Sequence, residues 1–175
     1  TYGELLEHIQ SLNIIDTHEH LPFEAERPKD ADVLSEWLTH YYSCDLVSAG
    51  LGDDALAAAR DSRKPLAERW RLVEPAWRAA ESTGYGRSLS LAARDLYGIE
   101  EINALTIEEL DRRFKEARAR GGWYRTVLKE KSKIALSIRD SAPAPYRESA
   151  DPFVYALRMD EFSCPTHHAM MRKAA

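Results

Sequence analysis

The sequence is poor in cysteine, in long apolar runs and in clustered positive charge. Its 175 residues contain two cysteines, Cys44 and Cys164, which form no Cys-x-x-Cys motif and no disulfide framework; this usage is typical of a reducing compartment. No apolar run approaches the roughly 20 residues that span a bilayer, and no basic region followed by an apolar one begins the chain. We therefore expect a cytoplasmic protein without a membrane partner.

The charge distribution also argues against a nucleic-acid partner. The formal net charge is −5, and lysine and arginine are scattered rather than massed into a patch. The hydrophobic content of 44% and the charged content of 30% are ordinary for a helix-rich globular protein. The length suits one domain or a piece of a larger one.

The most informative stretch runs from Asn13 to Pro22 and contains Asp16-x-His18-x-His20. Its β-branched residues predict a buried strand over 13–16. Because alternate residues of a strand share a face, we expect Asp16, His18 and His20 to project from the same side. Two neutral imidazoles on one rigid element form a partial shell for a divalent metal ion.

We therefore predict that His18 and His20 are metal ligands. Asp16 is interpreted as a residue that orients this network without binding the metal directly. The alternative is a pair of hydrogen-bonded surface histidines with no ligand.

The middle of the chain has helical spacing. A first helix is expected over residues 3–12. Asp32 is expected to cap a second helix, which includes Trp37 and Tyr41 and is broken at Gly50-Leu51-Gly52. Asp53 or Asp54 is expected to cap the next helix.

Proline and glycine divide the helices that follow. Pro75 should kink or split a helix, and Gly98 should end another. The sequence Thr106-x-x-Glu109 is typical of a capping box, and Gly121-Gly122 should end the helix behind it.

Two further strands are predicted near the end of the chain, over 133–138 and 153–157. Polar residues follow both: Arg139 and Asp140 after the first, Arg158 and Asp160 after the second. In parallel α/β architectures, ligands bind at the carboxyl ends of strands. The pattern therefore predicts an α/β fold with a site at that edge of the sheet.

The Asp16-x-His18-x-His20 motif after an apolar strand resembles strand one of the amidohydrolase superfamily, a group of metal-dependent (β/α)₈ barrels. The long helical segment after it is similar to the branch that contains uronate isomerase. His40-Tyr41 resembles that branch's His-Tyr segment near the substrate, and Pro65-Leu66 with the helices ending at Gly98-Ile99 resembles its insertion helices.

Arg158-Met159-Asp160 is similar to the family's Arg-Pro-Asp, whose arginine contacts a substrate carboxylate, although Met159 replaces the proline. Where uronate isomerases carry a Thr-Asp-Asp-Pro-like run, this chain has Ser-Ile-Arg-Asp, so only Asp140 matches. These departures favour an amidohydrolase relative over a strict uronate isomerase.

The resemblance implies the N-terminal part of a TIM-type barrel, with about three parallel strands and a large helical insertion after strand one. The implied layout is 1–30 for the first helix, strand one and the ligand loop, 31–130 for the insertion, and 131–175 for strands two and three. It also implies a divalent cofactor, zinc or alternatively manganese. The further ligands and the catalytic aspartate belong to later strands, so no catalytic residue is identified here. We expect a portion of a longer enzyme that is inactive alone.

The implied partner is a small carboxylated substrate, bound by Arg158, Tyr41 and Asp140; the full-length protein could form a homo-oligomer. Each of these residues also has a bland interpretation: an ion pair with Asp160 or Glu161 for Arg158, core packing for Tyr41, and a solvated turn for Asp140. His167 and His168 match no ligand motif of the family and are interpreted as part of a mobile tail. Cys164-x-x-His167 could hold zinc only if two more ligands came from elsewhere.

Three functions follow from the sequence. The leading one is a metal-dependent hydrolase of the amidohydrolase type. The second keeps the fold but isomerises a uronate between aldose and ketose forms. The third is a helical interaction module in which the histidine pair has no catalytic meaning.

Overall fold

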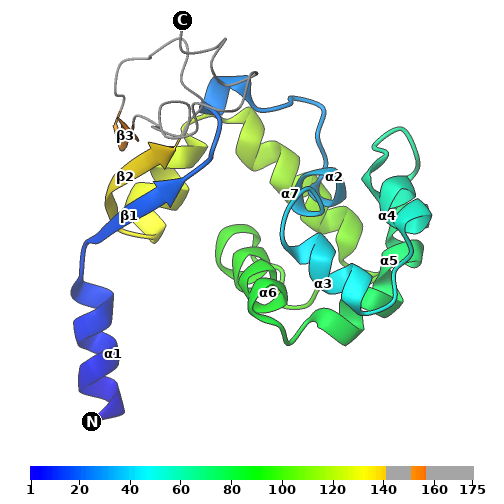
Figure 1. Cartoon of the computed structure of the whole chain (residues 1–175), viewed down its shortest axis with the longest axis horizontal. Helices are drawn as coiled ribbons and strands as arrows, with labels where there is room; N and C mark the ends of the chain where they lie inside the picture. The colour runs from blue at the N-terminus through cyan, green and yellow to red at the C-terminus, as the bar shows by residue number, and fades with distance from the viewer. Residues whose placement is uncertain (141–150, 157–175) are drawn as a thin grey trace, which may run out of the picture. The chain divides into compact units, whose positions relative to one another are not determined.

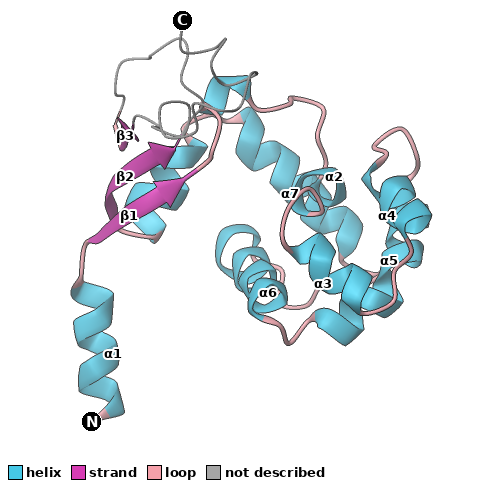
Figure 2. Ribbon diagram, viewed as in Figure 1, coloured by secondary structure: helices cyan, strands magenta, loops and turns pink. Residues whose placement is uncertain are grey.

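A parallel sheet of three strands carries His18 and Asp140, two of the predicted site residues. In this computed structural model, which describes residues 1–140 and 151–156, the strands β1 (Ile14–Glu19), β2 (Ile134–Asp140) and β3 (Phe153–Ala156) pair in that order (Figures 1 and 2). All three predicted strands are therefore present, and the fold is α/β. The strands β1 and β2 each run further toward the carboxyl end than predicted, so His18 and Asp140 belong to them.

The chain divides into two units. The sheet unit contains residues 1–26 and the described residues from 124 onward, and the helical unit is Arg27–Trp123. The helical unit is thus inserted between β1 and β2, which are neighbours in the sheet.

A small aromatic core supports one face of the sheet. Phe153 packs with Tyr124 and Leu128, the last of which lies on a π-helical segment, η2 (Arg125–Lys131). The Tyr124 hydroxyl donates to the Pro22 carbonyl at 2.8 Å, and its backbone N–H donates to the Glu24 carboxylate at 3.0 Å. These bonds attach the segment after β1, which includes the 3₁₀ turn η1 (Glu24–Glu26), to the helix that precedes β2.

The first strand is less buried than its sequence predicts. Ile14 is 48% exposed and Ile15 is 60% exposed. The preceding helix α1 (Tyr2–Ser11) buries none of its residues, although its apolar stripe predicts a packed face. Among the described residues nothing covers these side chains, so the expectation of a buried strand is wrong for this part of the chain.

The helical unit contains six α-helices around its own core. They are α2 (Val33–Trp37), α3 (Tyr42–Ser48), α4 (Asp53–Arg60), α5 (Leu66–Ala80), α6 (Gly84–Tyr97) and α7 (Ile107–Ala119). Their buried apolar side chains form one cluster, in which Trp70, Phe114 and Leu34 are among the largest fully buried groups. Burial of large aromatic and aliphatic groups is the main source of stability for such a unit.

A buried ion pair joins two helices of this unit. The Arg69 guanidinium donates to both carboxylate oxygens of Asp32, with 3.0 Å between Nη1 and Oδ1, and to the carbonyls of Ala59 and Lys64. Asp32 also caps α2 through a bond from the Ser35 backbone, as the sequence predicts. Burial raises the pKa of Asp32, but the bonds from Arg69 and Ser35 and the charge of Arg69 outweigh burial and lower the pKa overall.

Several helix boundaries differ from the predicted ones. The single helix expected between Asp32 and Gly50 is two helices: α2 ends at Trp37, and α3 begins at Tyr42 and ends at Ser48. The residue that caps α4 is Gly52, so Asp53 is the first helical residue rather than the cap. Pro75 does not split α5, which runs through it.

The predicted capping box at Thr106 is also wrong. The Thr106 hydroxyl donates to the Glu101 carbonyl at 2.6 Å and makes no capping bond to α7. The Glu109 carboxylate instead accepts bonds from Arg112 and Arg113. Gly98, with φ of 64°, ends α6 as predicted. No helix in residues 1–140 or 151–156 is long and apolar enough to cross a membrane.

Candidate metal centre

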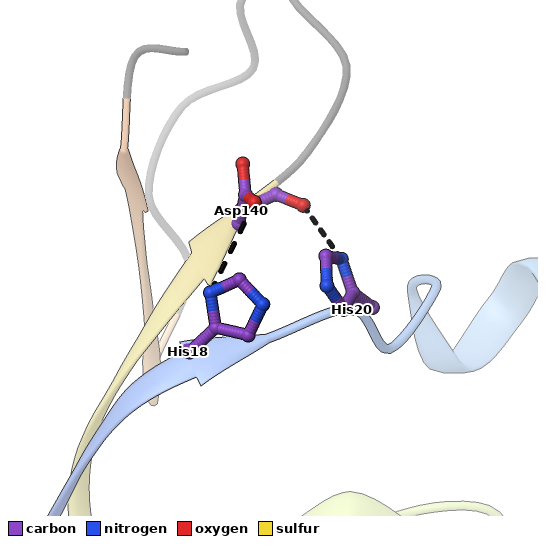
Figure 3. Close-up of side chains that lie close together, drawn as sticks. All are labelled: His18, His20 and Asp140. Carbon is purple, nitrogen blue, oxygen red and sulfur yellow. Dashed lines mark hydrogen bonds and ion pairs between the residues drawn. The ribbon is translucent and has the colours of Figure 1, made fainter. Parts of the chain in front are cut away.

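Two imidazoles and one carboxylate meet at the carboxyl end of the sheet. His18 lies on β1, His20 follows it, and Asp140 is the last residue of β2 (Figure 3). One ligand atom from each side chain lies within 4.8 Å of the others. The parallel pairing of β1 with β2 produces this arrangement, because it places both carboxyl ends at one edge.

His20 is held by the main chain of Asp140. Its Nδ1 lies 3.0 Å from the Asp140 carbonyl oxygen. Because a carbonyl only accepts hydrogen bonds, Nδ1 must carry the hydrogen. In the neutral ring this leaves Nε2 with its lone pair available for a metal ion, an arrangement common among metal-binding histidines.

His18 faces both other members of the group. Its Nδ1 lies 3.9 Å from the Asp140 Oδ2, which is too long for a hydrogen bond. Its ring meets the ring of His20 edge to face, with 4.5 Å between centroids. The His18 side chain is 65% exposed and that of Asp140 is 18% exposed, so the imidazole has room to turn toward the carboxylate.

Two further carboxylates fix the backbone that carries the histidines. The Asp16 carboxylate accepts from the His18 backbone N–H at 3.2 Å and from the Ser137 hydroxyl at 2.7 Å. The Glu19 carboxylate accepts from the backbone N–H groups of His20 and Leu21 at 2.6 and 2.9 Å. These bonds order the main chain immediately around both imidazoles.

Asp16 does not share a face with the histidines. Its register partner is Ser137, which lies three residues before Asp140 on a regularly paired strand, so Ser137 and Asp140 point to opposite faces of the sheet. The expectation that Asp16, His18 and His20 project from the same side is therefore wrong. The reason is a shift in the β1–β2 register between Asp16 and Glu19, which interrupts the alternation of side chains. The carboxylate of Asp16 is not part of the three-residue ligand group.

The donor set suits a divalent cation of the zinc type. Imidazole nitrogen and carboxylate oxygen both bind zinc at about 2.0–2.2 Å, and catalytic zinc sites use three such protein ligands with one open position. Two ligand atoms at these distances are at most about 4.4 Å apart around one ion. The widest separation in the group, up to 4.8 Å, therefore requires a small inward rotation of the exposed imidazoles.

The remaining predicted substrate contacts are Tyr41 and Arg158. Tyr41 belongs to the helical unit, where its exposed ring stacks on Tyr85 with 5.3 Å between centroids. Tyr41 is thus on the surface of that unit rather than in its core. Arg158 lies outside the described residues, as do Asp160, Cys164, His167 and His168.

Sequence reasoning missed two residues beside the centre, Ser137 and Glu19, whereas the sequence already marks Arg139 as a polar residue after a predicted strand. Ser137 is a strand residue 1% exposed, and only its polarity within an apolar run marks it in the sequence. Glu19 lies between the two histidines and carries no separate signal. The Arg139 guanidinium lies near the rings of Phe23 and Tyr155, at 4.7 and 5.6 Å from their centroids, and donates to the Tyr155 hydroxyl.

Comparison of the chain with protein-family models, with curated proteins and with solved structures finds no match. The residues and their geometry are therefore what carries a functional assignment.

Proposed function

We propose that this chain supplies part of the metal centre of a metal-dependent hydrolase of the amidohydrolase type, with His18, His20 and Asp140 as ligands of one divalent ion. The observation that carries the proposal is the convergence of these three side chains at the carboxyl ends of adjacent parallel strands. That edge of a parallel sheet is where α/β enzymes place their chemistry.

The arrangement favours Asp140 as a third ligand rather than as a substrate contact. The Asp140 carboxylate is less exposed to solvent than the His18 ring, and Asp140 lies on β2, the central strand of the three. Its main-chain carbonyl orients His20 at the same time. One residue thus contributes a ligand and the partner that fixes the tautomer of a second ligand.

A bound divalent ion of this class would lower the pKa of a coordinated water toward about 7, which would make hydroxide available near neutral pH. The residues of this chain would hold and orient that ion. Glu19 and Asp16 keep the main chain around the imidazoles in place, so the ligands need little reorganisation.

The finer parts of the proposal come from the resemblance. We propose that the three strands begin a (β/α)₈ barrel with the helical unit as an insertion after strand one. The further ligands and the general base would come from later strands. The substrate would be a small carboxylate, with Arg158 as its clamp and Tyr41 as a contact from the insertion.

Metal content tests the proposal directly. The purified chain is stripped with chelator, loaded with Zn²⁺ or Co²⁺, desalted and analysed by mass spectrometry of the bound metal. We expect about one equivalent in the wild type and almost none in the His18→Ala, His20→Ala double variant. His8→Ala removes an exposed imidazole from α1 and should bind as the wild type does. Equal metal content in the double variant and the wild type would sink the proposal.

A further inference from the structure

Between Asp16 and Glu19, the first strand contains one more residue than its partner strand. Asp16 pairs with Ser137 and Glu19 pairs with Arg139, so two residues of β1, Thr17 and His18, stand opposite one residue of β2. This is the count of a β-bulge, a feature that bends a strand and re-aims its side chains. In an unbroken ladder His18 would share the face of Asp16. The bulge instead turns His18 to the face of Asp140.

A hydrogen-bonded pair fixes the bulge at its start. The Ser137 hydroxyl donates to Asp16 Oδ2 at 2.7 Å, and the His18 backbone N–H donates to Asp16 Oδ1 at 3.2 Å. The Asp16 carboxylate therefore joins β2 to the main chain of His18. Ser137 is almost completely buried, so its hydroxyl needs this partner, because a buried hydroxyl without a hydrogen bond is destabilising.

We propose that Asp16 and Ser137 are positioning residues of the metal centre: their hydrogen bond holds the bulge that directs His18 toward Asp140. This inference rests on the proposed metal site. In this inference neither Asp16 nor Ser137 contacts the metal ion. Both act through hydrogen bonds on the face of the sheet opposite to the ligands. Loss of such outer partners weakens metal binding by about 10–100-fold in known metal sites.

Cobalt titration of the full chain tests the inference, because the visible absorption of Co²⁺ reports coordination geometry as well as affinity. We expect Asp16→Ala and Ser137→Ala each to weaken Co²⁺ binding by about tenfold or more and to change the absorption bands. The double variant should be no weaker than the worse single variant, since both substitutions remove one interaction. Thr17→Val, which removes the hydroxyl of an exposed bulge residue, should leave affinity and spectrum unchanged.

The variant Asp16→Asn separates positioning from ligation. The amide oxygen of the introduced side chain would accept from the His18 backbone, and its NH₂ would donate to the Ser137 hydroxyl, so the bulge would stay in place. We expect its Co²⁺ affinity to stay within about threefold of the wild type, whereas loss of a direct carboxylate ligand would lower the affinity further than loss of an outer partner. This comparison also holds if Ser137→Ala does not fold.

The possible outcomes distinguish the two proposals. A wild-type chain that binds no Co²⁺ overturns both the metal site and this inference. A wild-type chain that binds Co²⁺, together with an Asp16→Ala variant of unchanged affinity and spectrum, overturns this inference alone. Thermal unfolding of the metal-free variants identifies any variant whose loss of binding reflects loss of the fold.

Discussion

The Nδ1 atom of His20 donates a hydrogen bond to the main-chain carbonyl of Asp140, across 3.0 Å and 120 positions of sequence. The contact involves the backbone of Asp140, so it does not depend on that residue's side chain. It fixes the hydrogen of the neutral His20 ring on Nδ1.

The tautomer of His20 can be measured without any metal. Free neutral histidine favours the form with its hydrogen on Nε2, whereas the carbonyl partner requires the Nδ1–H form here. We expect nitrogen-15 NMR of the metal-free chain at alkaline pH to show Nδ1–H for His20. The exposed His8 of α1 provides the internal reference. An Nε2–H form of His20 would contradict the hydrogen bond.

Replacing Asp140 by asparagine should separate its two roles. The main-chain carbonyl that holds His20 is retained, while the charged ligand is lost. We expect zinc affinity, measured by competition with a chromogenic chelator, to fall by about a hundredfold. A loss of this size equals or exceeds the largest loss expected when a hydrogen-bond partner of a ligand is removed. As a control, Glu7→Gln removes one negative charge from α1 in the same unit and should leave zinc affinity unchanged. If Asp140→Asn binds zinc as tightly as the wild type, Asp140 is not a ligand.

Removal of one partner of the buried ion pair should strongly destabilise the helical unit. Arg69→Leu leaves the Asp32 carboxylate buried without its cation and should cost about 3–5 kcal/mol in the free energy of unfolding. All four tryptophans lie within the helical unit, so urea denaturation followed by tryptophan fluorescence reports this unit. Arg71→Leu changes an exposed arginine of the same helix and should leave the midpoint unchanged. Equal midpoints for the two variants would contradict the assignment.

The same pair predicts loss of stability in acid. The pKa of Asp32 is lower in the folded unit than in the unfolded chain, so its contribution is full above the unfolded value and is lost as pH falls through the folded value. The pKa of Glu36 is also lowered: burial raises it, but bonds from Arg27 and Arg118 and their charges outweigh burial. We expect the urea midpoint of the helical unit to fall progressively below about pH 4. In Asp32→Asn the midpoint should change less over this range, and an equally steep fall would assign the acid sensitivity to other groups.

Two glycines of α6 form a matched pair for a packing test. A Cβ atom at Gly86 would lie 2.5 Å from the Ala80 carbonyl oxygen and 2.8 Å from that of Glu81, whereas one at Gly84 would meet nothing within 4 Å. Since the obstacles are backbone atoms, Gly86→Ala should destabilise the unit by about 1–3 kcal/mol. Gly84→Ala should be neutral or stabilising by up to about 1 kcal/mol. Thermal unfolding of both variants measures the difference, and similar values for the two would contradict the close approach.

The sequence predicts local features well where one residue type decides them. Gly98 ends α6 because a left-handed conformation suits glycine, and Asp32 caps α2 because its carboxylate reaches the Ser35 backbone. Thr106 shows where this reasoning fails. The motif for a capping box is present, but the Thr106 hydroxyl donates to a carbonyl of the preceding loop. The Glu109 carboxylate accepts hydrogen bonds from arginines of α7 instead of from the cap residue.

The histidine pair could be predicted from strand alternation and imidazole chemistry, but its surroundings could not. Asp140 becomes a neighbour of His18 only through pairing of strands that are far apart in sequence. The bulge at Thr17 and His18 depends on a hydrogen bond between Asp16 and the buried Ser137, and no local sequence pattern indicates that partnership. These features arise from register, which a single sequence specifies only weakly.

The insertion of the helical unit between β1 and β2 has a consequence for the order of folding. The helical unit is one continuous segment, Arg27–Trp123, whereas the bond between His20 and Asp140 spans 120 positions. Closing so long a loop costs chain entropy before any contact compensates for it, and an inserted unit that is already compact shortens the distance to be closed. During synthesis the helical unit emerges complete before β2 does, and domains generally fold as units. We therefore expect the candidate centre to assemble late in folding. His18 and His20 come together with Asp140 only after the inserted helical unit has formed.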